Sequence, residues 1–206
     1  GGKANTLLGD GTLSTEAPGQ EPNDTFDFDP EDPVPPVGGQ SMFIDCTGPR
    51  DRRPVEGRDD VLVYSTEPLE RNVEVTGPIE LTLYAASDGP DTDFTATLVD
   101  VHHGGIAIHI TEGIVRARFR EAYEEPTLIE PNRILEYSIQ LWETSNLFKA
   151  GHQIRLEISS SNFPRFDRNL NTGGPIHREA AGQVAINTVF HDNLRPSHIV
   201  LPVIPG

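Results

Sequence analysis

The chain has 206 residues, 35% of them hydrophobic and 7% aromatic, and a formal net charge of -16 at pH 7. This length fits one large domain. The acidity argues against binding to nucleic acid or to an anionic membrane, since both carry negative charge. No apolar run approaches the roughly 18 residues of a membrane helix, and the single Cys46 excludes an intrachain disulfide. We therefore expect neither a nucleic acid nor a membrane as partner, and a cytoplasmic location.

The first 40 residues differ in composition from the rest. Residues 4–49 contain no Lys or Arg, and the stretch EPNDTFDFDPEDPVPPVGG at 21–39 carries six acids and five prolines. Proline fixes φ and cannot donate to a strand ladder, so the pattern predicts an extended, irregular strap. A disordered linker is the alternative, but Phe26 and Phe28, two residues apart, favour a segment that lies along a surface. We expect residues 1–40 to form a strap continuous with a domain over 41–206.

From residue 60 onward the hydrophobic pattern alternates with a period of two, which is typical of strands with one buried face. Gly, Pro, Asp and Asn turn signals separate the alternating runs. Nine strands are expected, at residues 60–66, 79–84, 93–101, 106–110, 114–120, 134–142, 153–158, 183–190 and 198–203. Short helical turns are expected only at 144–151 and 175–182. The fold class predicted is all-β: a two-sheet antiparallel jelly-roll sandwich, galactose-binding-like, in a single domain.

Three serines in ISSSNFPRFDRNLNTGG (158–174) raise the alternative of a self-contained hydrolase. Asp167 and His177 lie downstream, and a triad is defined by geometry rather than by spacing. However, no G-x-S-x-G motif is present, no glycine flanks Ser159–Ser161 and no helix pattern follows them. Hydroxyls that bind backbone groups at a strand end are the commoner arrangement, so we expect no catalytic residue in this chain.

No pattern in the chain indicates a cofactor or a metal, and we expect neither. His102 and His103 are adjacent, so a strand would point them to opposite faces, and His109 lies seven residues away without a zinc-like spacing. The acids of the strap resemble a calcium loop only loosely, since the glycine and the closing Glu of an EF-hand are missing. Asp91 and Asp93 are expected to accept backbone N–H groups or to pair with arginine.

Arg116, Arg118 and Arg120 alternate along one expected strand. Anion recognition is one interpretation, but pairing with acidic residues is favoured in so acidic a chain. Trp142 is the only tryptophan, which is weak support for a carbohydrate-binding module. That module, a stand-alone carbohydrate- or ligand-binding sandwich, is the alternative function.

Several long motifs together resemble one family. They are ANTLLGDGTLSTEAPG (4–19), DPEDPVPPVGG (29–39), RDDVLVYSTEPL (58–69), VEVTGPIELTLYAAS (73–87), DTDFTATLVDV (91–101), EGIVRARFRE (112–121), GHQIRLEISSSNFPRFDRNLNTGG (151–174) and PSHIVLPVIPG (196–206). The chain resembles the C-terminal domain of the CocE/NonD serine hydrolases, a family of esterases and X-Pro dipeptidyl-peptidases.

This resemblance implies a non-catalytic domain of an acyl hydrolase. The catalytic groups of the family lie upstream, so the partners implied are an α/β-hydrolase domain and a helical cap domain of the same protein. The chain begins Gly1-Gly2-Lys3 and its only methionine is Met42, which favours a fragment. The resemblance also implies that Met42 and Phe43 wall part of the substrate pocket. A domain separated from its partners exposes an apolar face, so a homodimer is a further expectation.

The loop after residue 158 is therefore expected to act as a structural clasp or a domain-interface loop. Its polar residues would satisfy backbone groups or pair with acids of this domain or of the neighbouring ones. The residues expected to do so are Asn162, Arg165, Asp167, Arg168 and Asn169.

Overall fold

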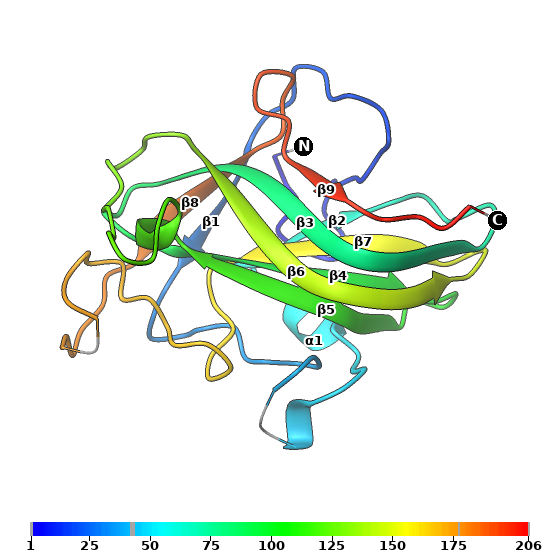
Figure 1. Cartoon of the computed structure of the whole chain (residues 1–206), viewed down its shortest axis with the longest axis horizontal. Coiled ribbons are helices and arrows are strands. Elements are labelled where there is room, and N and C mark those ends of the chain that lie inside the picture. The colour runs from blue at the N-terminus through cyan, green and yellow to red at the C-terminus, as the bar shows by residue number, and fades with distance from the viewer. Residues whose placement is uncertain (1, 42–43, 177, 206) are drawn as a thin grey trace.

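The computed structural model describes residues 2–41, 44–176 and 178–205. Within these residues the secondary structure is almost entirely β (Figure 1). The strands are β1 (Asp24–Phe28), β2 (Leu62–Ser65), β3 (Val73–Ser87), β4 (Asp93–Val101), β5 (Ala107–Arg116), β6 (Leu135–Phe148), β7 (Gln153–Ser159), β8 (Ala185–Phe190) and β9 (His198–Val200). The helical turns are η1 (Ile44–Cys46), α1 (Arg53–Glu56) and η2 (Ala117–Phe119). No helix in these ranges is long and apolar enough to cross a membrane.

Two antiparallel sheets are formed, in the orders β1-β8-β3-β6 and β2-β7-β4-β5, and β9 pairs with β3 beside β8. The pairs β1–β8, β2–β7, β3–β6 and β4–β5 are those of one long hairpin that has been rolled up. This connectivity is that of a jelly roll. The predicted two-sheet antiparallel sandwich is confirmed.

The core lies between the sheets and follows from the alternation in sequence. In β3 the side chains of Ile79, Leu81 and Leu83 are at most 1% exposed, and they share one core cluster with Phe94 of β4 in the other sheet and Tyr137 of β6. The rings of Phe94 and Tyr137 lie 5.0 Å apart in a tilted arrangement. Aromatic and branched side chains that interlock in this way contribute most of the free energy that stabilises a sandwich.

Part of the expected strap belongs to a sheet. Within it, Asp24–Phe28 pairs with β8, and Phe26 and Phe28 are buried in the core. The following residues cover the outer face of β2-β7-β4-β5, where Val34 packs with Val55 and Val63. Both faces of this second sheet are therefore buried, and every residue of β4 is buried.

Three local predictions were wrong. The strands expected at 106–110 and 114–120 form one strand, β5, which ends at Arg116 because the backbone N–H of Arg118 binds Asp91 and the chain turns into η2. Residues 144–148 continue β6 instead of forming a helical turn, since Phe148 pairs with Val73 at the end of a long ladder. Residues 175–182 form no helix in the part that the structure describes.

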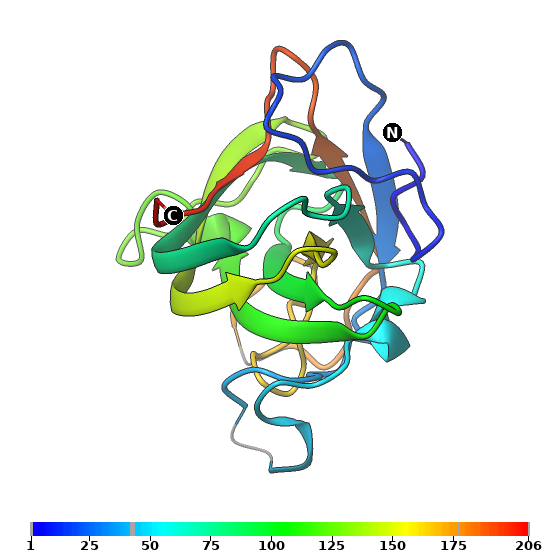
Figure 2. The ribbon, with the colours of Figure 1, turned by 90° about the vertical axis from the view of Figure 1, so that its right-hand side faces the viewer.

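One loop stands away from the sandwich. Gly39 and Gly48 close it through two backbone hydrogen bonds of 3.0 and 2.9 Å. The chain around η1 projects from the sheets at the bottom of Figure 1 and of Figure 2. We call the described residues 39–41 and 44–48 the projecting loop.

Candidate functional site

The serines that follow β7 are buried and hydrogen-bonded. Ser159, Ser160 and Ser161 are at most 5% exposed. Ser159 Oγ donates to the Asp60 carbonyl at 2.7 Å, Ser160 Oγ accepts from Asn187 Nδ2 at 2.7 Å, and Ser161 Oγ accepts from the Val34 N–H at 2.8 Å. All three hydroxyls thus tie β7 to other segments of the domain. His177, the histidine of the alternative triad, lies outside the described residues.

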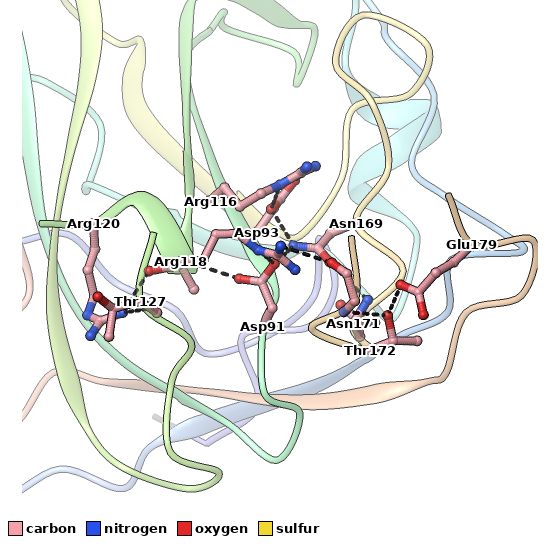
Figure 3. Close-up of polar contacts among 12 residues, drawn as sticks. Asp91, Asp93, Arg116, Arg118, Arg120, Thr127, Asn169, Asn171, Thr172 and Glu179 are labelled. Atoms are coloured by element: carbon pink, nitrogen blue, oxygen red, sulfur yellow. Dashed lines mark hydrogen bonds and ion pairs between the residues drawn. The ribbon is translucent and has the colours of Figure 1, made fainter. Parts of the chain in front are cut away.

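Asn169 lies at the centre of a buried polar cluster (Figure 3). Its Nδ2 donates to Asp91 Oδ2 at 2.9 Å and to Asp93 Oδ1 at 2.8 Å. Arg118 binds Asp91 with its Nε at 2.7 Å, and Arg116 binds Asp93 through two nitrogens at 2.8 and 2.9 Å. The arginines are therefore matched to acids of the same domain, as expected, and the cluster fastens the loop to the start of β4.

Two effects shift the pKa of Asp93 in opposite directions. Burial raises the pKa of this carboxyl, and the hydrogen bonds from Arg116 and Asn169 act in the opposite direction. The carboxylate has three hydrogen bonds from charged or amide donors, which satisfy both of its oxygens. Removing any of these donors would leave a buried carboxylate short of a partner, which is costly.

The same loop reaches β5 and the projecting loop. Asn162 Nδ2 donates to Glu112 Oε2 at 2.6 Å, and Arg165 Nε donates to Glu112 Oε1 at 2.7 Å. Arg165 also donates to the Gln40 carbonyl at 2.6 Å. One carboxylate on β5 therefore holds both side chains, and Arg165 links it to the base of the projecting loop.

Asp167 and Arg168 complete the contacts of the loop. The Asp167 carbonyl accepts a bond from Arg116 at 3.2 Å. Arg168 donates to the Pro30 carbonyl and lies 3.4 Å from a carboxylate oxygen of Glu31. The loop thus joins the strap, β4 and β5 within this domain.

A groove of about 330 Å³ opens between the projecting loop, β5 and β6. Its lining includes Gly39, His109, Glu112, Trp142 and Arg165. Trp142 is 61% exposed and has a φ of 65°, a conformation that few residues other than glycine adopt. Ligands are usually bound in concave sites with aromatic and a few polar side chains, so this groove is the candidate functional surface of the domain.

His109 forms the floor of this groove and is 4% exposed. Neither ring nitrogen has a hydrogen-bond partner among the described residues. Burial and the positive charges of Arg52 and Arg165 lower the pKa of His109 to about 3, so the ring is neutral near pH 7. A Cβ on Gly39 would lie 2.7 Å from His109 Nε2, so only glycine lets the loop close over the ring.

A buried charged cluster that the sequence pattern did not reveal lies beside the strap and α1. Arg52 Nη2 lies 2.5 Å from Glu157, and Arg155 Nη1 lies 2.9 Å from Glu56. All four are at most 6% exposed. Despite Arg155, burial and the charge of Glu157 raise the pKa of Glu56 to about 7. The alternation in QIRLEI marked Arg155 and Glu157 as a polar face, but nothing in the pattern showed that the strap and α1 cover it.

Met42 and Phe43 fall outside the described residues. In the sequence they lie between the two described parts of the projecting loop, 39–41 and 44–48. The base of that loop is fixed by the Gly39–Gly48 bridge and by the bond from Arg165 to Gln40. The expected role of Met42 and Phe43 therefore stays a prediction.

The acids of the strap have partners within the domain. Asp24 accepts bonds from the Ala4 N–H and the Tyr64 hydroxyl and contacts His191 at 2.8 Å. Asp32 pairs with Arg58 at 3.2 Å. Asp24 is thus tied to three other segments of the domain, and Asp32 to Arg58.

Comparisons with known proteins place the whole chain in one group. The model of the X-Pro dipeptidyl-peptidase C-terminal non-catalytic domain matches residues 1–200. Cocaine esterase of Rhodococcus sp. (strain MB1 Bresler) is 52% identical over 206 residues, which cover 98% of this chain and 36% of that protein. The chain therefore spans about a third of the length of that relative.

Solved structures show the same relation. The crystal structure of an aminopeptidase from a marine sediment Thaumarchaeota archaeon matches 98% of this chain with a TM-score of 0.87 and 29% identity. An α-amino acid ester hydrolase matches 95% of it with a TM-score of 0.85 and 30% identity. This chain covers 36% and 35% of those two chains. In each case the similarity is to one part of a larger hydrolytic enzyme.

Proposed function

Since the chain belongs to the family of X-Pro dipeptidyl-peptidase C-terminal non-catalytic domains of CocE/NonD-type hydrolases, we propose that it supports the catalytic part of a serine acyl hydrolase. It would stabilise an α/β-hydrolase domain of the same protein and help to wall its substrate pocket. The observation that carries this proposal is the match over almost the whole chain to about a third of an esterase. The buried, hydrogen-bonded state of Ser159–Ser161 supports a structural role for these serines.

Among the activities of the family, we favour hydrolysis of an ester for the longer protein. The relative at 52% identity is named as an esterase, and a solved structure at 30% identity is named as an ester hydrolase. An X-Pro dipeptidyl-peptidase activity is the alternative, because relatives of that name match at 27% identity. Comparing turnover of an aryl ester and of an X-Pro dipeptide amide by the longer protein would decide between the two.

The projecting loop is the part of the domain that we assign to the pocket. Its base is rigid, because the Gly39–Gly48 bridge and Arg165 hold it. Its position away from the sheets suits a contact with another domain (Figure 2). Met and Phe are suitable walls for an acyl or aromatic group, since one is adaptable and the other is large and flat.

Substituting Met42→Ala and Phe43→Ala in the longer protein tests this assignment. We expect kcat/KM for an aromatic acyl ester to fall by about 10-fold or more, since each apolar contact contributes roughly 1.5–3 kcal/mol. Hydrolysis of an acetyl ester should change far less, because the acetyl group does not reach the wall. The control is Leu194→Ala, a residue that is 79% exposed on another loop. Equal loss on both esters, or no loss, would remove the loop from the pocket.

Two further properties are proposed. A homodimer would cover exposed apolar side chains such as Leu8 and Tyr123, which are 96% and 82% exposed. Size-exclusion chromatography with light scattering tests it, and a monomer at micromolar concentration would refute it. We also propose a cytoplasmic location, in keeping with the single cysteine, and fractionation of cells that express the longer protein would test that location.

A further inference from the structure

The register of β4 and β7 brings His152 close to Asp100 and His102. Val101 lies opposite Gln153, so the next position along the ladder sets His102 opposite His152. Asp100 precedes His102 by two residues and therefore points to the same side of the sheet. Asp100 is paired with Ile154, a residue of the main core, so this side is the inner one. Three potential ligands thus meet at one end of the sandwich.

The contacts among the three side chains are close. His152 Nδ1 lies 2.9 Å from Asp100 Oδ1, and His102 Nε2 lies 3.6 Å from Asp100 Oδ2. The two imidazole rings are stacked, with centroids 4.4 Å apart and 28° between their planes. One donor atom from each residue lies within 4.8 Å of the other two. Both carboxylate oxygens therefore face an imidazole nitrogen.

The site combines the buried carboxylate of Asp100 with a histidine that solvent can reach. The side chain of Asp100 is 7% exposed and that of His152 is 14% exposed, whereas that of His102 is 41% exposed. A cation can approach from the side of His102 and reach a carboxylate that is mostly shielded from water. The net charge of -16 raises the local concentration of cations around the whole domain.

We propose that Asp100, His102 and His152 bind a divalent transition-metal ion of the zinc class. Two imidazole nitrogens and one carboxylate oxygen are the protein ligands of many three-ligand zinc sites, with a water molecule in the fourth position. Nitrogen ligands disfavour Ca²⁺ and Mg²⁺, which take oxygen. The donor atoms bound to one tetrahedral Zn²⁺ lie about 3.3 Å apart. The three donor atoms must therefore move closer together when the ion binds. The side chain of His102 can move most easily, because it is the most exposed of the three.

The ion would join two hairpins. His102 opens the turn between β4 and β5, where Gly105 N–H binds the His102 carbonyl at 2.9 Å. His152 closes the turn between β6 and β7, where its N–H binds the Lys149 carbonyl at 3.0 Å. A bound ion crosslinks these turns and closes the end of the core between the sheets. Its binding free energy therefore adds to the stability of the folded chain.

Titration of the chelator-treated chain with Zn²⁺ and with Co²⁺ tests the proposal. Calorimetry should give one ion per chain, thermal unfolding should shift upward with Zn²⁺, and the Co²⁺ complex should show a d–d spectrum without a thiolate band. His102→Ala and His152→Ala should each weaken metal binding by more than about tenfold. Even the loss of a residue that only hydrogen-bonds to a metal ligand lowers metal affinity by about tenfold or more. His102 is the more exposed histidine, so its variant should keep the fold, which circular dichroism checks.

Two variants serve as matched controls. His103→Ala removes the exposed neighbour of His102 and should leave the affinity unchanged. Cys46→Ser removes the only thiol and should also leave it unchanged. The proposal is overturned if neither metal binds, if His152→Ala and His102→Ala bind as tightly as the original chain, or if His103→Ala loses as much affinity as they do.

Discussion

At the scale of single residues, the interior of the domain contains several paired charges. Glu56, Glu157, Asp91 and Asp93 are at most 2% exposed, and each lies against an arginine or a hydrogen-bond donor. Buried ion pairs often add little net stability, because desolvation offsets attraction. Their removal one partner at a time is nevertheless costly, since it leaves an unmatched group. Substitutions of Glu56 and Asn169 test the effect of these buried groups on stability.

Glu56 should contribute a stability that falls as pH rises from about 4.5 to 7, whereas the lowered pKa of His109 acts in the opposite direction up to about pH 6.5. Burial and Glu157 raise the pKa of Glu56 from 4.5 to about 7. A folded-state pKa above the unfolded value favours the protonated carboxyl, so this contribution is complete below about pH 4.5 and is lost as pH passes 7. The loss between pH 4.5 and 7 is on the order of 3 kcal/mol.

Chemical denaturation from pH 5 to pH 8.5 checks this prediction. Relative to the original chain, Glu56→Gln should gain unfolding free energy as pH rises from 5 to 7, since the amide does not ionise, and this gain isolates the decline that Glu56 causes. Glu121→Gln, at a residue that is largely exposed beside Arg120, should leave the decline intact. A decline of the same size in Glu56→Gln would show that other groups cause it.

Asn169→Ala should destabilise the chain by about 2–4 kcal/mol. The change removes two hydrogen bonds to the buried carboxylates of Asp91 and Asp93 and one to the backbone of Asn171. Asn193→Ala, at an exposed position, is the control for the same substitution. Urea unfolding measures both, and similar small effects would mean that Asn169 does not hold the loop.

The sequence indicated part of this residue-scale picture. Pairing of the arginine row with acids was predicted from the acidic composition, and the structure shows Arg116 with Asp93 and Arg118 with Asp91. The burial of Arg155 and Glu157 was not predictable, because alternation shows which residues share a face but not what covers that face. His152 was overlooked beside His102 because 50 residues separate them, and only the strand register brings them together.

At the scale of elements, hydrophobic periodicity located β2 to β9, but it missed β1, divided β5 into two strands and misplaced several ends. The expected strand at 93–101 coincides with β4. β6 runs on to Phe148, where a helical turn was expected, because pairing with β3 outweighs the weak local preference of TSNLF. β1 lies within a proline-rich, acidic stretch, and only Phe26 and Phe28 indicated that the stretch contacts the core.

The strap should therefore be part of the cooperative fold. Phe28→Ala should cost about 3–5 kcal/mol, because the ring is fully buried between the sheets. Thr25→Ala on the exposed side of β1 should cost well under about 1 kcal/mol. Urea unfolding followed by tryptophan fluorescence and by circular dichroism tests this, and a small effect of Phe28→Ala would make the strap peripheral.

At the scale of the whole molecule, the fold was predictable and the functional surface was not. Nine regular alternations separated by turns predict a jelly roll, and its hairpin-like pairing is observed. The groove depends on the projecting loop, on a positive φ at Trp142 and on the closure of Gly39 over His109. These are long-range and backbone features that periodicity does not encode.

The central claim is that the chain is a non-catalytic domain that supports a hydrolase. The most direct measurement is the rate of ester hydrolysis when the purified chain is titrated into the separately produced catalytic part of the longer protein. We predict no hydrolysis of p-nitrophenyl acetate by the chain alone, and a saturable rise in the activity and thermal half-life of the catalytic part. The account is contradicted if the chain alone turns over ester and loses this activity on Ser161→Ala, or if saturating chain leaves the catalytic part unchanged.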